Sequence, residues 1–418
     1  MRQGTRNRTG CLVAALLAIG MSGWAQAVVT DTPPPDGKKP FYINHYGVAA
    51  PHYLEQSDSY KWPCTILATA DQQGKLTPLG QDVLHRLNLL WQDAEGRTGE
   101  LTEVGRQLIR TQTRQLTTRY PEVFTKGAIM DGRCLLVNQS IMTMNEALLQ
   151  VALLGRGMTI RPKASNRDRN WMNPRDKEIE ALHNDSIAKV CYDDFVARHC
   201  DNRRLMASLF NDTAYVTRHV DATRLSRYLF VLAKHVPYTT VKDSVALADL
   251  FTPDEWQRHR TTLNAKRYLD YGKCTLVGGQ QPFLQRTPLW NLLHMGDSIM
   301  KRDEPVSHLR YVQEGMLLSL ISLMELDNYG LATDNLETLE ANGWIAEQMV
   351  PPCGNLKMIH YRRDKNDPDV LVKVLLNDRE MRLPIKTDCT PYYHWQDVKR
   401  YYLQKLYAYE KEAADRQE

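Results

Sequence analysis

The fold is decided first by the stretch FYINHYG at residues 41–47. Its aromatic and β-branched side chains favour an extended conformation, and the closing glycine marks the end of a strand. The next apolar residues recur at helical spacing, at Leu79, Val83, Leu87 and Leu90. A buried strand followed by an amphipathic helix is the opening unit of an α/β fold.

A second helix is predicted from Thr102 to Arg119. Threonine is a favoured N-cap, and the dipeptide Tyr120-Pro121 ends the helix, because the residue before a proline is disfavoured in helical conformation. An apolar strand is predicted at residues 135–137 and another helix at 141–154. Strands and helices alternate, so we predict a central, mostly parallel sheet with flanking helices.

Helical patterns dominate the middle of the chain. They fall at residues 176–197, 203–209, 223–232, 253–269 and 288–301. Strand patterns return at residues 306–311, 358–361, 369–376 and 380–384, before a closing helix at 395–412. We therefore predict an α/β domain built from residues 41–160 and 299–418, with an inserted, mainly helical domain at 161–298. A ligand cleft is expected where the two meet, at the carboxyl ends of the strands.

The N-terminus has the features of an export signal. Arg2, Arg6 and Arg8 precede an apolar run at residues 11–24, and Ala25-Gln26-Ala27 fits a small-residue cleavage site. We expect residues 1–27 to be a signal peptide and residues 28–40 an extended leader. The sequence thus predicts an exported protein, periplasmic or secreted. No later run approaches the length of a membrane helix.

Charge and cysteine content limit the function further. A formal charge of +4 over 418 residues gives no case for nucleic-acid binding. Removal of Cys11 with the signal leaves seven of the eight cysteines, widely spaced and without a CxxC pair. The sequence therefore predicts no zinc or redox site. Cys191 and Cys200 could close a loop as a disulfide, and buried unpaired thiols are the alternative for the rest.

Several segments, taken in order, resemble a known family. Residues 101–105 (LTEVG) and 119–124 (RYPEVF) are similar to the LTxxG and RYPxxF segments of histidine acid phosphatases, and 391–395 (PYYHW) resembles their C-terminal segment. The branch most resembled is that of the phytase-like multiple inositol polyphosphate phosphatases. The resemblance runs from about residue 40 to 406. It implies a phosphomonoester hydrolase that forms a phosphohistidine and requires no cofactor or metal.

The residues that carry that chemistry are replaced in this chain. The family places Arg-His-Gly-x-Arg after the first strand, where this chain has Val48-Ala49-Ala50-Pro51-His52. The nucleophile thus falls on Ala49 and the two arginines on Val48 and His52. A further phosphate-binding arginine falls on Gln139, and the second histidine falls on Gln313. We call Val48, Ala49, His52, Gln139 and Gln313 the family positions.

The general acid depends on which family register the chain follows. In a His-Asp register the acid is Glu314, whereas in the His-Ala-Glu register it falls on Gly315 and is lost. His45 is a possible substitute nucleophile, although a packed histidine of the strand is the better interpretation. His52, Arg133, Gln139 and Gln313 are weak candidates for ligand binding.

Two hypotheses follow from these replacements. The first is a pseudophosphatase that binds a ligand, such as an inositol phosphate, or a protein partner. The second is an atypical acid phosphatase that uses His45 or His52 with Glu314.

Overall fold

The computed structural model describes residues 31–415, and the proposed signal peptide lies outside them. One sheet forms the centre, with its eight strands in the order β10-β8-β7-β1-β5-β2-β3 and β9 paired to β8. The strands are β1 Lys39–Val48, β2 Ile129–Cys134, β3 Thr159–Ala164, β5 Val306–Val312, β7 Asn355–Arg362, β8 Leu371–Leu376, β9 Arg379–Glu380 and β10 Tyr392–His394. A separate pair joins β4 (Lys273–Cys274) to β6 (Ala332–Thr333).

Four adjacent strands of the large sheet, β1, β5, β2 and β3, run parallel. Strand β7 pairs antiparallel to β1, so β7, β8 and β10 form an antiparallel extension. Val48 at the end of β1 pairs with Val312 at the end of β5. We call this the carboxyl edge of the sheet, and the edge where β1 begins at Lys39 the amino edge. The predicted α/β fold with a mostly parallel sheet is confirmed.

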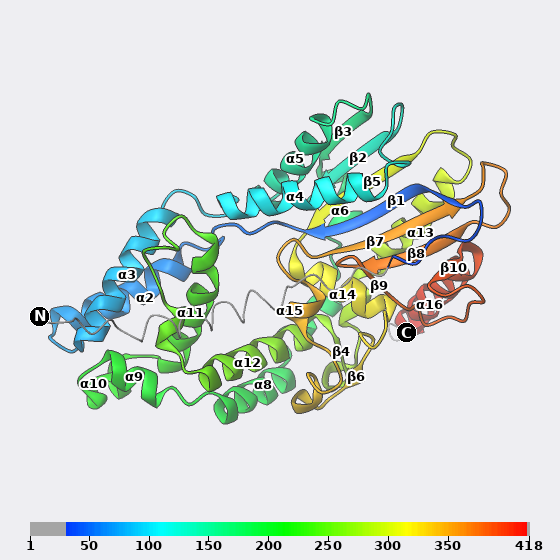
Figure 1. The fold of residues 1–418 in the computed structure, drawn as a ribbon. Coiled ribbons are helices and arrows are strands. Elements are labelled where there is room, and N and C mark those ends of the chain that lie inside the picture. The colour runs from blue at the N-terminus through cyan, green and yellow to red at the C-terminus, as the bar shows by residue number, and fades with distance from the viewer. Residues whose placement is uncertain (1–30, 416–418) are drawn as a thin grey trace, which may run out of the picture.

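Helices cover both faces of this sheet (Figure 1). One face packs on α4 (Glu103–Arg119) and α5 (Asn138–Ala152), whose buried residues share a core with Ile43, Met130 and Leu309. The other face packs on α13 (Arg286–Ile299), α14 (Glu314–Met324) and α16 (Trp395–Asp415). Three layers of this kind bury both faces of the central strands, which is why the parallel strand β5 and the antiparallel strand β7 are both buried along their whole length.

The remaining helices stand beside the sheet (Figure 1). They are α2 Asp58–Gln72, α3 Pro78–Ala94, α6 Arg169–Met172, α7 Lys177–Leu182, α8 Ser186–His199, α9 Arg203–Leu209, α10 Thr213–His219, α11 Ala222–His235, α12 Pro253–Tyr271 and α15 Ala346–Met349. Helices α2 and α3 share a hydrophobic core with α9, α10 and α11. The helical part therefore draws on residues from before and after α4 and α5. The predicted domain boundaries stay a prediction, and β3 runs across the one at residues 160 and 161.

Five details of the sequence prediction are wrong. The strand expected at residues 380–384 is the short β9, Arg379–Glu380, and residues 381–384 are irregular. The strand expected at residues 135–137 lies earlier in the chain, as β2, which ends at Cys134. It was misplaced because its buried residues Met130, Gly132 and Cys134 alternate with less buried ones and so form no continuous apolar run. The helix expected at 176–197 is broken into α7 and α8. Helix α2 was not predicted because Pro63 lies inside it, and proline is usually excluded from the interior of a helix. Cys191 and Cys200 are both free thiols.

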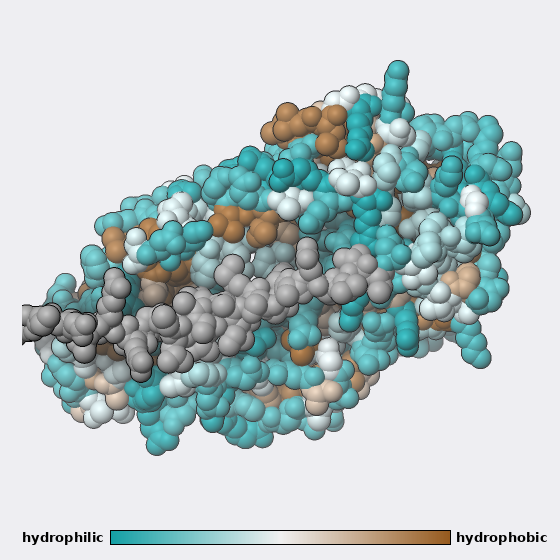
Figure 2. All heavy atoms as spheres, in the orientation of Figure 1, coloured by the Kyte–Doolittle hydropathy of each residue, from teal (hydrophilic) through white to brown (hydrophobic). Residues whose placement is uncertain are grey.

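The surface is mainly hydrophilic on the face drawn in Figure 2, with hydrophobic residues in small patches. Leu149 of α5 and Leu153, directly after that helix, are among the exposed apolar side chains. Among residues 31–415, no helix combines the length and the hydrophobicity that crossing a bilayer requires.

Candidate functional site

The family positions gather at the carboxyl edge of the sheet. Gln139 lies in the first turn of α5, and Gln313 is the N-cap residue of α14. The Nε2 atom of Gln139 donates to Oε1 of Glu55 at 2.5 Å, and Nε2 of Gln313 lies 3.5 Å from the same oxygen. Two amides at the start of two helices therefore converge on one carboxylate.

Glu55 was not identified from the sequence, although it is the first acidic residue after β1. Helix N-termini favour negative charge, because their backbone N–H groups lack partners within the helix. In a phosphatase of the resembled family, this is the place for an anionic substrate. Here an anion belonging to the same chain accepts hydrogen bonds from the residues at two of the family positions.

The loop after β1 is held by its backbone. The N–H of Ala49 donates to the carbonyl of Val312 at 3.1 Å, and the N–H of Ala50 donates to Oγ1 of Thr143 at 3.0 Å. The carbonyl of Pro51 accepts from the N–H and the hydroxyl of Thr102 at 3.1 and 3.2 Å. The N–H groups of Ala49 and Ala50, which a phosphate-binding loop would offer to its ligand, are thus satisfied within the fold.

Gly105 explains how closely this loop packs on α4. A Cβ atom added to Gly105 would lie 2.0 Å from the carbonyl oxygen of Pro51, far inside any permitted contact. Thr102 caps α4 by accepting from the N–H of Gly105 at 3.1 Å, as the sequence predicted. The loop therefore rests directly on the first turn of α4.

His52 is half-buried, and its ring is held by the loop itself. Its Nδ1 lies 2.8 Å from the carbonyl oxygen of Ala50, so Nδ1 carries a hydrogen and donates it. In the neutral ring, Nε2 is then an acceptor and cannot donate to a phosphate oxygen. His52 does not replace the two-pronged donor geometry of an arginine.

Glu314, the first residue of α14, is bound by an arginine. Arg267 of α12 donates to both carboxylate oxygens, Nε to Oε1 at 3.0 Å and Nη2 to Oε2 at 2.9 Å. A general acid must present a carboxyl oxygen to the leaving group, whereas both oxygens of Glu314 are engaged by the guanidinium of Arg267.

The alternative acid position, Gly315, has no room for a side chain. A Cβ atom there would lie 2.3 to 2.7 Å from atoms Cζ, Cε1 and Oη of Tyr271. The ring of Tyr271 therefore fills the space that a glutamate of the His-Ala-Glu register would need.

His45 is buried in the sheet, with a side chain that packs 5.5 Å from the ring of Tyr311. Burial lowers the pKa of His45 to about 3, and the charge of Lys357 lowers it further. The Nδ1 atom has no hydrogen-bond partner. A neutral, enclosed imidazole of this kind fits the interpretation of His45 as a packed histidine of the strand.

Arg133 lies on β2, and its charge is balanced by carboxylates. Its Nε donates to Asp131 at 2.8 Å and its Nη1 to Asp168 at 2.7 Å, where Asp168 belongs to the 3₁₀ helix Asn166–Asp168. The structure does not bring Arg133 into hydrogen-bond contact with Glu55, Gln139 or Gln313. Of the four candidate ligand-binding residues, only Gln139 and Gln313 share a hydrogen-bond partner, which is Glu55.

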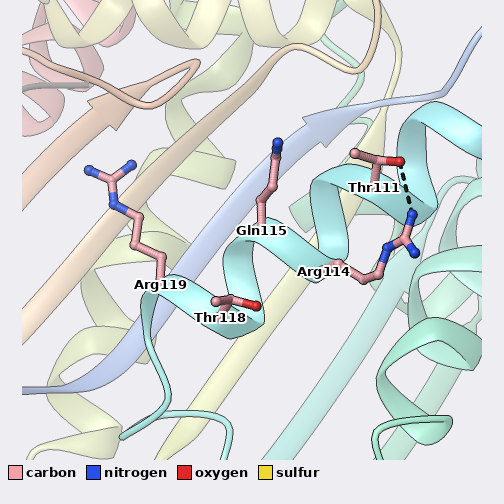
Figure 3. Close-up of a pocket in the computed structure, with 5 residues that line it drawn as sticks. All are labelled: Thr111, Arg114, Gln115, Thr118 and Arg119. Carbon is pink, nitrogen blue, oxygen red and sulfur yellow. Dashed lines mark hydrogen bonds between the residues drawn. The ribbon is translucent and has the colours of Figure 1, made fainter. Parts of the chain in front are cut away.

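Two hollows of the described surface lie away from these residues. One, of about 420 Å³, runs along α4 and is lined by Thr111, Arg114, Gln115, Thr118 and Arg119 (Figure 3). Arg119 there is already paired with Asp31 and Asp378. The second lies at the amino edge, beside Lys39 and Arg362. Neither hollow corresponds to the cleft expected at the carboxyl edge.

Comparison with solved structures supports the fold. A multiple inositol polyphosphate phosphatase of Bifidobacterium longum, in complex with inositol hexasulfate, has a TM-score of 0.74 at 12% identity, covering 90% of this chain and 94% of that chain. A phytase from D. castellii has a TM-score of 0.64 at 13% identity, covering 90% of this chain and 81% of that one. A Hafnia alvei phytase in complex with tartrate has a TM-score of 0.53 at 13% identity, covering 89% and 98%.

At this identity the likeness establishes the fold alone. The chain has the architecture of inositol polyphosphate phosphatases and phytases. No family model and no curated protein matches its sequence.

Proposed function

We propose that this protein is an exported pseudophosphatase. It keeps the fold of inositol polyphosphate phosphatases, does not hydrolyse phosphomonoesters, and acts by binding a ligand or a protein partner. The observation that carries the proposal is the hydrogen-bonded contact of Gln139 and Gln313 with Glu55. A site for a phosphate dianion needs positive groups, whereas this one presents a carboxylate between two neutral amides.

The carboxylate of Glu55 occupies the place that an incoming anion would take. Its carboxylate lies beside the first turns of α5 and α14, where a phosphate would otherwise find unpaired N–H groups. An incoming anion must displace Glu55 or approach it against like-charge repulsion. Because Glu55 is exposed, solvent screens this repulsion in part, and we expect weak anion binding.

The test for activity is direct. The purified protein is incubated with a chromogenic phosphomonoester and with phytate between pH 4 and 7, and we expect no turnover above the buffer rate. The variants His45→Ala and Glu314→Gln are assayed beside it. Turnover that either variant abolishes would establish the atypical phosphatase and overturn the pseudophosphatase proposal.

The test for binding uses inositol hexasulfate and inorganic phosphate in thermal-shift titrations. Glu55→Gln removes the competing charge and keeps the side-chain length, so we expect it to bind inositol hexasulfate several-fold more tightly than the parent. The matched control is Glu95→Gln, which removes an exposed carboxylate at the end of α3 and leaves affinity unchanged. Equal affinity in parent and Glu55→Gln would contradict the role given to Glu55.

A further inference from the structure

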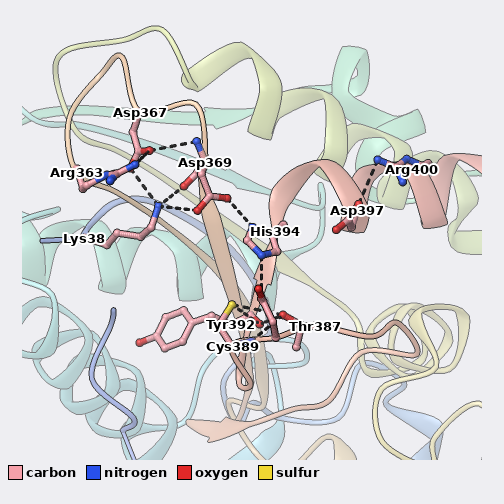
Figure 4. A network of polar contacts seen from close by, with 11 residues as sticks. Lys38, Arg363, Asp367, Asp369, Thr387, Cys389, Tyr392, His394, Asp397 and Arg400 are labelled. Carbon is pink, nitrogen blue, oxygen red and sulfur yellow. Dashed lines mark hydrogen bonds and ion pairs between the residues drawn. The ribbon is translucent and has the colours of Figure 1, made fainter. Parts of the chain in front are cut away.

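Three side chains of different chemistry converge at the amino edge of the sheet. Asp388, Cys389 and His394 each offer one donor atom, and these three atoms lie within 4.8 Å of one another. The residues come from the loop before β10 and from the last position of that strand (Figure 4). The wide cysteine spacing, without a CxxC pair, predicts no zinc site, and this cluster was missed because the three donors come from three different residue types.

His394 is oriented as metal-binding histidines are. Its Nδ1 lies 2.5 Å from Oδ1 of Asp369, and its Nε2 lies 3.0 Å from Oδ1 of Asp388. Because Nδ1 donates to Asp369, Nε2 is the nitrogen that a metal ion would take, in place of the proton that Nε2 now donates to Asp388. Asp369 is itself held, because Nζ of Lys38 lies 3.3 Å from its Oδ2.

The thiol of Cys389 lies in polar surroundings. Its Sγ is 3.4 Å from Oγ1 of Thr387 and 3.5 Å from the carbonyl oxygen of Tyr392. The loop that carries it is braced, since Oγ1 of Thr387 donates to the same carbonyl at 2.8 Å. Cys389 is half-buried and is a free thiol, so its sulfur is not held in a disulfide bond.

We propose that Asp388, Cys389 and His394 form a binding site for a zinc ion. Sulfur, imidazole nitrogen and carboxylate oxygen together are the donor set that Zn²⁺ takes in proteins, at metal–ligand distances of about 2.0 to 2.3 Å. Such bonds place tetrahedral ligand atoms roughly 3.3 to 3.7 Å apart, so the three side chains need to close only slightly. Solvent supplies the fourth ligand.

This site is separate from the family positions. His394 pairs with Leu371, Leu371 with Tyr361, and Tyr361 with Pro40, so His394 lies beside the start of β1. The family positions follow the end of the same strand. Bound zinc would tie the loop at residues 387–391 to β10 and, through Asp369, to β8, whether or not the carboxyl edge binds anything.

The experiment uses the tag-free full chain, reduced and freed of metal, and titrates it with Co²⁺ and then Zn²⁺. We expect one ion per chain and a thiolate-to-cobalt charge-transfer band that zinc abolishes. Cys389→Ser and His394→Gln should lose the band. The matched control Cys64→Ser, a half-buried thiol on α2, should keep it.

Two further variants separate metal binding from folding. Asp388 has a side chain that is 81% exposed, so Asp388→Asn leaves the fold intact and should weaken zinc binding at least tenfold. Asp369→Asn should weaken it by about 10- to 100-fold, as loss of a carboxylate behind a histidine ligand does. Absence of binding in the parent, a cobalt band that survives in Cys389→Ser, or an unchanged zinc affinity in Asp388→Asn would overturn the proposal.

Discussion

The two edges of the central sheet differ in how they use charge. At the carboxyl edge, Glu55 is bonded to the neutral amides of Gln139 and Gln313. At the amino edge, ion pairs run in a chain from Arg363 through Asp367, Lys38 and Asp369 to His394 (Figure 4). The carboxyl edge thus presents neutral amides to a single carboxylate, and the amino edge is rich in paired charges.

The difference shows that scaffold and chemistry are separable in this fold. Strand pairing and the two helix layers bury the same kinds of residues whether or not the loops beyond the strands carry catalytic groups. Loss of an arginine or histidine from such a loop removes activity and leaves the cores intact. The buried ion pairs at the amino edge are different, because removing one partner leaves the other charge buried.

The largest loss of stability is expected from a substitution that disturbs the packing of the loop after β1 on α4. Gly105→Ala forces a Cβ atom into the carbonyl of Pro51, so the loop or α4 must move. We expect a loss of about 3 kcal/mol or more in the free energy of unfolding, measured by urea denaturation. Gln107→Ala, on the exposed side of the same helix, should cost about 0.5 kcal/mol or less. Similar values for the two variants would contradict the close contact.

The second largest effect is expected from removing a charged side chain, and the loss of stability should differ between the two edges. Lys38 is 8% exposed and neutralises Asp367 and Asp369, so Lys38→Met should destabilise by about 2–3 kcal/mol. Glu55→Gln at the carboxyl edge should change stability by less than about 1 kcal/mol, because Glu55 is exposed. Chemical denaturation of both variants at pH 7 tests the comparison, and equal losses would break it.

Acid should destabilise the protein through His45. Its folded pKa of about 3 is below the unfolded value of about 6.5, so the unfolded chain binds more protons and stability falls as the pH drops below 6.5. Between pH 7 and 4.5 the parent should lose about 2.5 kcal/mol more than His45→Gln. Urea denaturation across this range is the measurement, with exposed His85→Gln as the control that keeps the parent's slope. If the unfolding free energy of His45→Gln fell with pH as steeply as that of the parent, the burial of His45 would be contradicted.

The smallest effect concerns the pair between Arg267 and Glu314. Both side chains are partly exposed, at 29% and 39%, so Arg267→Ala should cost about 1 kcal/mol or less. It should also leave the protein without phosphatase activity. Arg258→Ala, which removes a more exposed ion pair with Asp254 on the same helix, is the control for stability. Phosphate release by Arg267→Ala would show that the ion pair alone prevents Glu314 from acting as a general acid.

The sequence by itself determined the local structure and the missing chemistry. Sequence patterns located β1, α3, α4, α12 and β5, because the burial pattern of a strand or helix is repeated along its own residues. The identities of Val48, Ala49, Gln139 and Gln313 are facts of the sequence, so the prediction that the family's charged groups are replaced needed no structure. The polar strand β2 was misplaced because Asp131 and Arg133 pair with each other and with residues of other elements.

Tertiary structure alone decided what now occupies both edges. It brought Glu55 to two glutamines that lie 84 and 258 residues further along the chain, and it set the ring of Tyr271 where a side chain at position 315 would lie. It also placed Asp369 behind His394. Such contacts depend on how distant segments pair and pack, and no local pattern of propensity or periodicity encodes that pairing.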